Sequence, residues 1–209
     1  MYKKYWMEPK ALGRPAKFDR DQAVDTVMDE IWARGYEACS VKALSETLGI
    51  TRSSFYNAFG SRDALFEEVL SLYVTRAPDH ALEDVAEGDL VLPAIERLFR
   101  EIARARAADK DALGCLAVNC IAELAGNEKP SGAIMEKALR TNIDRFERLL
   151  RQAARNGEIE SARGAREKAL ELQSLQIGLN VLSKVERDER TLWAVAKQTL
   201  YGLGLLPKQ

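Results

Sequence analysis

The stretch from Ser40 to Phe59 constrains this chain more than any other part of its sequence. Apolar residues recur there at helical spacing up to Gly49 and resume after it, which predicts two short helices joined by a sharp turn. Gly49 tolerates a positive φ, Ser45 is small enough for two helices to cross closely, and Ile50 would fill the corner. The stretch therefore predicts a helix-turn-helix.

The second helix of this pair has an apolar face and a hydrogen-bonding face. Phe55, Ala58 and Phe59 share the apolar face. The residues expected to face outward are Thr51, Arg52, Ser53, Ser54, Tyr56 and Asn57. Such a set suits the major groove of DNA, where base edges present donors and acceptors. Helix pairs joined by a glycine turn also occur in α-helical proteins without this role, so the functional interpretation depends on the exposed face.

Length and composition favour a globular helical protein. The 209 residues suffice for one large or two small domains. Hydrophobic residues make up 46% and charged residues of mixed sign make up 30%, as in amphipathic helices. The net charge of −1 gives no general attraction to nucleic acid, so DNA binding would need a local concentration of positive charge.

Residues 1–17 are expected to form a flexible basic arm that supplies such a concentration. The basic residues at this end are Lys3, Lys4, Lys10, Arg14, Lys17 and Arg20, against Glu8 and Asp19. Arg14, between Gly13 and Pro15, favours an extended chain that could lie in a minor groove. A tail that only improves solubility fits the same pattern, and both interpretations stay open.

Local signals predict how the helices around the pair begin and end. Asp19 is an expected N-cap, with Gln22 three residues later, and Gly35 should end that first helix. Ser40 and Thr51 are expected to cap the next two helices. The free N–H groups beside the Ser40 hydroxyl could also bind a phosphate.

Arg62 is expected at the start of a longer helix that Pro78 ends. A cation there is unfavourable on helix-dipole grounds, so a DNA phosphate would explain it, although a solvated arginine fits as well.

The sequence lacks the motifs typical of membrane proteins, metal-binding or disulfide-rich proteins and enzymes. There is no run of about 18 apolar residues and no signal-peptide core, so a soluble cytoplasmic protein is expected, with no membrane partner. Cys39, Cys115 and Cys120 form no CxxC pair and His80 is the only histidine, which argues against a metal site or a disulfide framework. Phosphate-binding, dinucleotide-binding and hydrolase motifs are missing, so neither enzyme activity nor a cofactor is expected.

A series of motifs fills the first third of the chain without interruption. It comprises a Gly-Arg-Pro arm, an aspartate-capped helix ending in Arg34-Gly35-Tyr36, Ser-Val-x-x-Leu-Ser-x-x-Leu-Gly-Ile, and Ser-Ser-Phe-Tyr-Asn-Ala-Phe-Gly-Ser-Arg-Asp-Ala-Leu-Phe. This series resembles the TetR family of transcriptional regulators. The resemblance implies a DNA-binding domain at 18–60, a ligand-sensing and dimerisation domain at 61–209, and a homodimer through the last two helices.

The resemblance also assigns roles by position. Arg52, Ser53, Tyr56 and Asn57 would face bases, and Ser40, Ser54, Tyr56 and Arg62 would hold phosphates. Ser45 departs from the alanine usual in the family, but it is small enough to keep the corner.

The rest of the chain is helical by period, which predicts an all-α fold of about nine helices. After a polar linker at 78–88, helices are expected at about 92–102, 113–125, 130–156, 165–186 and 189–205. The last two carry apolar residues on more than one face, which favours a four-helix bundle with a second copy. Gly178, Gly202 and Gly204 would allow the helices of the two copies to approach closely.

The helix expected at 113–125 carries Cys115, Asn119 and Glu123 four residues apart on one face. This row could line a pocket for a small-molecule effector. Alternatively, Asn119 bonds a neighbouring carbonyl and Glu123 reaches solvent. Cys115 lies at a helix start, where the dipole lowers a thiol pKa, so it could sense oxidants or electrophiles. Nearby acids oppose this shift, and most free cysteines are inert.

These inferences predict a homodimeric DNA-binding regulator, most consistent with a repressor of a near-palindromic operator. A small-molecule or an electrophile or oxidant signal in the C-terminal domain would move the two reading helices away from adjacent major grooves. The alternatives are a non-specific architectural DNA-binding dimer and a helical small-molecule-binding protein.

Overall fold

The computed structural model describes residues 19–206, and every regular element in this range is a helix. The elements are α1 (Arg20–Arg34), α2 (Val41–Thr47), α3 (Arg52–Phe59), α4 (Arg62–Arg76), the 3₁₀ helix η1 (Pro78–Leu82), α5 (Val91–Ala108), α6 (Leu116–Leu124), α7 (Pro130–Arg155), α8 (Ala165–Leu182) and α9 (Glu189–Gly202). The predicted all-α fold is confirmed.

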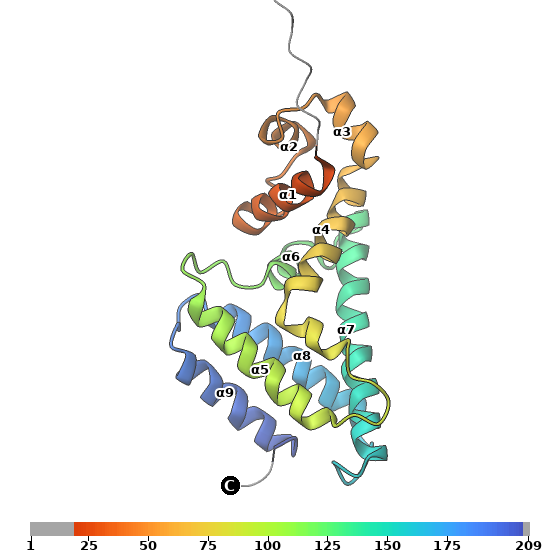
Figure 1. Ribbon diagram of the computed structural model, residues 1–209, viewed down its shortest axis with the longest axis vertical. Coiled ribbons are helices and arrows are strands. Elements are labelled where there is room, and N and C mark those ends of the chain that lie inside the picture. The colour runs from red at the N-terminus through yellow and green to blue at the C-terminus, as the bar shows by residue number, and fades with distance from the viewer. Residues whose placement is uncertain (1–18, 207–209) are drawn as a thin grey trace, which may run out of the picture.

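The molecule is elongated, with a small group of helices at one end and a larger group at the other (Figure 1). Helices α1, α2 and α3 form the small end, which we call the head. Helices α5, α8 and α9 and most of α7 form the other end, which we call the body. Helix α4 leads from the head toward the body, so a change at one end can reach the other through it.

Two apolar cores lie along the long axis. One joins α1, α2 and α3 to α4 and α6, and the other joins η1 and α5 to α7, α8 and α9. Buried side chains of α6, such as Leu116 and Leu124, belong to the first core. The head is therefore supported by α4 and α6, although α6 follows it by more than fifty residues in the sequence.

The helices of the head begin where the sequence predicts. The Asp19 carboxylate accepts the N–H groups of residues 21 and 22, each at 3.1 Å. The Ser40 hydroxyl accepts the N–H of residue 43 at 3.2 Å, and the Thr51 hydroxyl accepts that of residue 54 at 3.1 Å. All three expected caps are confirmed.

The corner between α2 and α3 has the expected form. Gly49 has a φ of 64°, and the N–H of Ile50 donates to the carbonyl oxygen of Ser45 at 3.0 Å. The Ser45 side chain is buried in the corner, which its small size allows. The helix-turn-helix is confirmed.

The helix expected at 113–125 begins later than predicted, at Leu116. Ala112 and Gly114 have φ values of 55° and 74°, and Cys115 is extended, so the chain cannot be helical before residue 116. The Gly114 carbonyl oxygen, just before α6, accepts hydrogen bonds from Trp32 and Arg106. None of the helices between residues 19 and 206 combines the length and apolar character needed to cross a membrane.

Candidate nucleic-acid interface and effector region

Helix α3 buries one face and exposes the other. Phe55 and Phe59 are 0% and 4% exposed and pack in the core of the head, and Ala58 is half-buried. The exposed residues are Thr51, Arg52, Ser53, Ser54, Tyr56 and Asn57. The residues expected to face outward therefore do so, and they form one continuous hydrogen-bonding surface.

The start of this surface is fixed by the α3 cap. The hydroxyl oxygens of Thr51 and Ser54 lie 2.9 Å apart, and the N–H of Ser54 donates to Thr51. The Tyr56 ring meets Phe55 edge to face, with 5.9 Å between the ring centroids. The buried Phe55 thus supports an aromatic side chain that is half exposed and free to reach a partner.

Arg62 has partners inside the molecule. Its guanidinium lies 4.0 Å from the centre of the Tyr36 ring, and Nη2 lies 4.0 Å from a carboxylate oxygen of Glu37. These contacts explain a cation at the start of α4 without a phosphate. Its predicted phosphate contact stays a prediction, and Arg14 lies outside the described residues.

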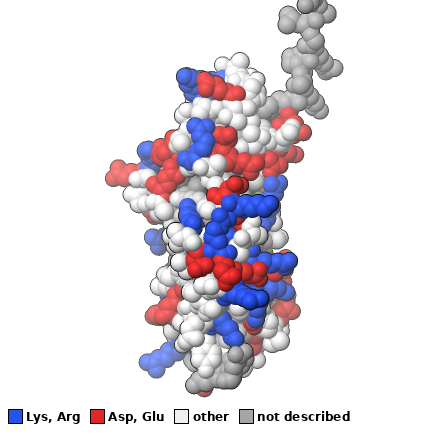
Figure 2. All heavy atoms as spheres, turned by 90° about the vertical axis from the view of Figure 1, so that its left-hand side faces the viewer, with Lys and Arg blue, Asp and Glu red and all other residues white. Residues whose placement is uncertain are grey.

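Charge on the surface is mixed. The face in Figure 2 carries basic and acidic side chains interspersed along its length. The ion pairs include Lys129 with Glu37 at 2.8 Å and Arg76 with Asp25 at 2.6 Å. A face with mixed charge of this kind gives little long-range attraction to DNA.

The polar row on α6 differs from what its sequence predicts. Glu123 neither reaches solvent freely nor lines a pocket with Cys115: its carboxylate accepts the N–H groups of Tyr36 at 2.9 Å and Glu37 at 2.7 Å. Both N–H groups belong to the turn between α1 and α2. Gly35 has a φ of 83°, which favours glycine, and a Cβ there would lie 3.0 Å from a Glu123 carboxylate oxygen. Glu123 therefore fastens the head to α6.

The Asn119 side chain donates to the carbonyl oxygen of Leu113 at 2.8 Å. The sequence allowed this bond to a neighbouring carbonyl as the alternative to Asn119 lining a pocket. Asn119 and Glu123 border a cavity of about 590 Å³ beside Trp32 and Lys184, whereas Cys115 borders a different cavity. The row of three residues does not line one pocket, and that expectation is wrong.

Cys115 is buried and occupies the N-cap position of α6, without a side-chain cap hydrogen bond. Its sulfur accepts the hydroxyl of Tyr73 at 3.3 Å. Burial raises the pKa of the Cys115 thiol, and this outweighs the Tyr73 bond and the positive charge of Arg106. The lowered thiol pKa expected from the helix dipole is therefore wrong in direction.

The cavity beside Cys115 has a volume of about 600 Å³ and lies between α4, α6, α7 and α8. Its polar lining includes Asn142, whose amide donates to Gln173 at 2.7 Å and to Gln176 at 2.9 Å. Burial raises the pKa of Asp79, which borders the same space. A mostly apolar cavity with a few convergent amides and charged side chains of both signs, such as Asp79 and Arg145, suits a small organic molecule.

Helix α8, helix α9 and the turn between them expose large apolar side chains. These are Leu170, Val181, Leu182, Val185 and Val195, and Val185 is 83% exposed. Within the described chain, a Cβ at Gly178 or Gly202 would meet no atom within 4 Å. Exposed apolar side chains gathered in this way are typical of a surface that packs against another protein surface.

Two family models match the chain. One, described as bacterial regulatory proteins, tetR family, matches residues 24–69. The other, described as tetracyclin repressor-like, C-terminal domain, matches residues 92–199. The two matches cover the head with part of α4 and most of the body.

Curated relatives and solved structures agree with these matches. The HTH-type transcriptional repressor ComR of Escherichia coli is 32% identical over 144 residues, which are 68% of this chain and 67% of ComR. The repressor BdcR of the same organism is 29% identical over 114 residues, 54% of this chain and 58% of BdcR. A cysteine mutant of the TetR family transcriptional regulator CifR, complexed with 26 bp double-strand operator DNA, is 29% identical with a TM-score of 0.76. That similarity covers 90% of this chain and 98% of the other, through both head and body.

Proposed function

Because the chain belongs to the TetR family of DNA-binding transcriptional regulators, we propose that it is a homodimeric repressor that leaves its operator when an effector binds the body. The observation that carries this proposal is the exposed polar face of α3. Six polar residues, the N-cap Thr51 and five residues of α3, are exposed, and the opposite face of the helix is anchored by two buried phenylalanines. A helix presented in this way can enter a major groove.

The exposed residues divide into two roles. Arg52, Ser53, Tyr56 and Asn57 face base edges in this proposal. The phosphates would be held by Ser40, Ser54, Tyr56 and Arg62, with Thr51 beside them at the start of α3, and Arg14 would lie in the adjacent minor groove. Arginine and asparagine make the bidentate contacts that distinguish guanine and adenine, so Arg52 and Asn57 would carry the largest share of specificity.

A second copy would supply the second α3. The exposed apolar surface of α8 and α9 supports pairing there, because its burial removes side chains such as Val181 and Val185 from water. The open space at Gly178 and Gly202 supports close helix approach. A two-fold dimer would place its reading helices about 34–36 Å apart, one turn of DNA, on a near-palindrome.

The effector would be a small organic molecule in the cavity of about 600 Å³ between α4, α6, α7 and α8. Helix α4 borders this cavity and also contacts α1 in the head. A ligand that favours a shifted α4 would therefore change the spacing of the two heads. An electrophile or oxidant could act from the same cavity through Cys115, although a buried thiol with a raised pKa reacts slowly.

Selection of bound sequences from random DNA tests the proposal, with the full chain and with and without oxidant. We expect enrichment of a two-fold symmetric site whose half-sites are about one helical turn apart. Bound DNA without any enriched sequence would instead favour a non-specific architectural protein. Cys115→Ser should abolish any oxidant effect, and an unchanged effect would remove Cys115 as the sensor.

A further inference from the structure

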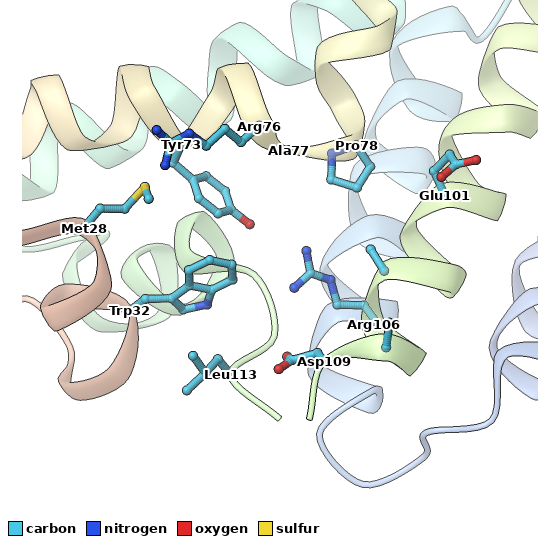
Figure 3. Close-up of a pocket in the computed structure, with 12 residues that line it drawn as sticks. Met28, Trp32, Tyr73, Arg76, Ala77, Pro78, Glu101, Arg106, Asp109 and Leu113 are labelled. Carbon is cyan, nitrogen blue, oxygen red and sulfur yellow. The ribbon is translucent and has the colours of Figure 1, made fainter. Parts of the chain in front are cut away.

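A separate cavity, of about 510 Å³, lies where the head meets the body. Figure 3 shows its lining: Met28 and Trp32 come from α1, Tyr73 from α4, and Arg106 from α5. Leu113, in the segment before α6, closes one side. The guanidinium of Arg106 points into this space, toward Trp32 and Tyr73.

Arg106 is a buried cation without a carboxylate partner. It is only 6% exposed, and within residues 19–206 no Asp or Glu oxygen lies within 4.0 Å of its side-chain nitrogens. One Nη donates to the carbonyl oxygen of Gly114. The buried Nε has no hydrogen-bond partner in the described chain. Burying a guanidinium in this way is costly, and an anion in the cavity would offset the cost.

The acids and the other base around the cavity are engaged elsewhere or exposed. The Asp109 carboxylate accepts the N–H of Gly114 at 2.7 Å. Arg76 pairs with Asp25 at 2.6 Å, and Glu101 lies on the surface. Arg106 is thus the buried charge that a ligand would meet, and most of the remaining lining is apolar or aromatic.

We propose that this cavity binds a small organic carboxylate. Its carboxylate would pair with the Arg106 guanidinium, which has a free Nε–H to donate. Its apolar part would lie against Trp32, Met28 and Leu113. Binding itself does not depend on the repressor function, but its consequence for DNA rests on that proposed function.

The consequence follows from the Gly114 carbonyl. This oxygen accepts Trp32 Nε1–H from α1 at 3.2 Å as well as the Arg106 guanidinium from α5. It therefore links the head to the body just before α6. A carboxylate that draws Arg106 away would leave the Trp32 bond as the remaining contact to this oxygen and loosen the position of α1.

Calorimetric titration of the full chain tests the site without DNA. The probes are benzoate, phenylacetate and hexanoate, each compared with its primary amide, which has a similar shape and no charge. We expect at least one carboxylate to bind at least about tenfold more tightly than its amide, as a charge-assisted hydrogen bond requires. Equal binding of acid and amide throughout, or no carboxylate binding, would overturn the proposal.

Variants locate the bound carboxylate. Arg106→Met should weaken it at least about tenfold, and Arg106→Lys should restore part of the affinity. Ala105→Trp, which fills the cavity and keeps Arg106, should abolish binding. This second variant tests the site even if Arg106→Met fails to fold. The matched control is Arg145→Met, because Arg145 is mostly buried beside the other cavity and pairs with Glu83 at 2.8 Å. Loss of binding in this control but not in Arg106→Met would overturn the assignment.

The same titrations with operator DNA separate the two proposals. Arg106-dependent carboxylate binding by a chain that binds no DNA supports the site and refutes the repressor. A chain that binds its operator but shows no preference for carboxylates keeps the repressor and refutes the site.

Discussion

Helices α3 and α6 are both short, and each carries a row of polar side chains, but the two rows meet different surroundings. The polar residues of α3 between Arg52 and Asn57 are all exposed, whereas Phe55 among them is buried. On α6, Asn119 bonds a carbonyl of its own connecting segment, and Glu123 bonds the turn that follows α1. A sequence indicates which residues share a helix face, but tertiary packing decides whether that face meets solvent or protein.

The strongest test of this contrast is on the buried side of α3. Phe55→Ala should lower the free energy of unfolding by about 3–5 kcal/mol, because the ring is fully buried in the core of the head. Tyr56→Ala, one residue along on the exposed face, should change it by less than about 1 kcal/mol and weaken DNA binding instead. Urea denaturation measures both, and similar losses would mean that α3 does not have two distinct faces.

Glu123→Ala should lower the free energy of unfolding by about 2–4 kcal/mol. The change leaves two N–H groups in the turn after α1 without the charged acceptor that now binds both. Glu128→Ala, at an exposed position just after α6, is the matched control and should stay within about 0.5 kcal/mol. If the two variants unfold alike, Glu123 does not fasten the head.

The raised pKa of Cys115 predicts slow thiol chemistry. At neutral pH a thiol with a raised pKa has less thiolate than an ordinary cysteine, and the fraction increases only as the pH rises toward that pKa. Alkylation of Cys115 by iodoacetamide at pH 7 should be at least about tenfold slower in the folded chain than in urea. Peptide mapping by mass spectrometry measures it. Equal rates would contradict the raised pKa, and a faster rate in the folded chain would restore the lowered pKa expected from the helix dipole.

Arg62→Ala should weaken binding to specific and random DNA by a similar amount, about 1 kcal/mol, and reduce the salt dependence. It should also cost about 0.5–1 kcal/mol of stability, because the guanidinium stacks on Tyr36. Arg62→Lys keeps the charge and loses the planar contact, so it should affect stability more than DNA binding. Unchanged DNA affinity in the alanine variant would make the role of Arg62 purely internal.

The sequence predicted most reliably what depends on near neighbours. Asp19, Ser40 and Thr51 each bond N–H groups two or three residues away, so their caps follow from the local pattern. The two faces of α3 follow from helical periodicity in the same way. The sequence also supported an all-α fold, because amphipathic patterns continue to the end of the chain.

Long-range contacts could not be predicted in this way. The bond from Glu123 to Tyr36 spans 87 residues, and no local signal shows which turn the carboxylate reaches. The pKa of Cys115 depends on burial among α4, α5 and α6, which outweighs the helix start that its sequence suggests. No sequence pattern predicted the buried site at Arg106, because in the sequence it is one of several arginines on an amphipathic helix.

The central claim is that the exposed face of α3 reads bases, and Arg52→Ala tests it most directly. Affinities for the selected operator and for random DNA should be measured at the same salt concentration, with Arg163→Ala, an exposed arginine far along the chain, as the control. The account predicts a loss of about 1–3 kcal/mol on the operator and little change on random DNA. Equal losses on both DNAs, or no loss on the operator, would contradict it.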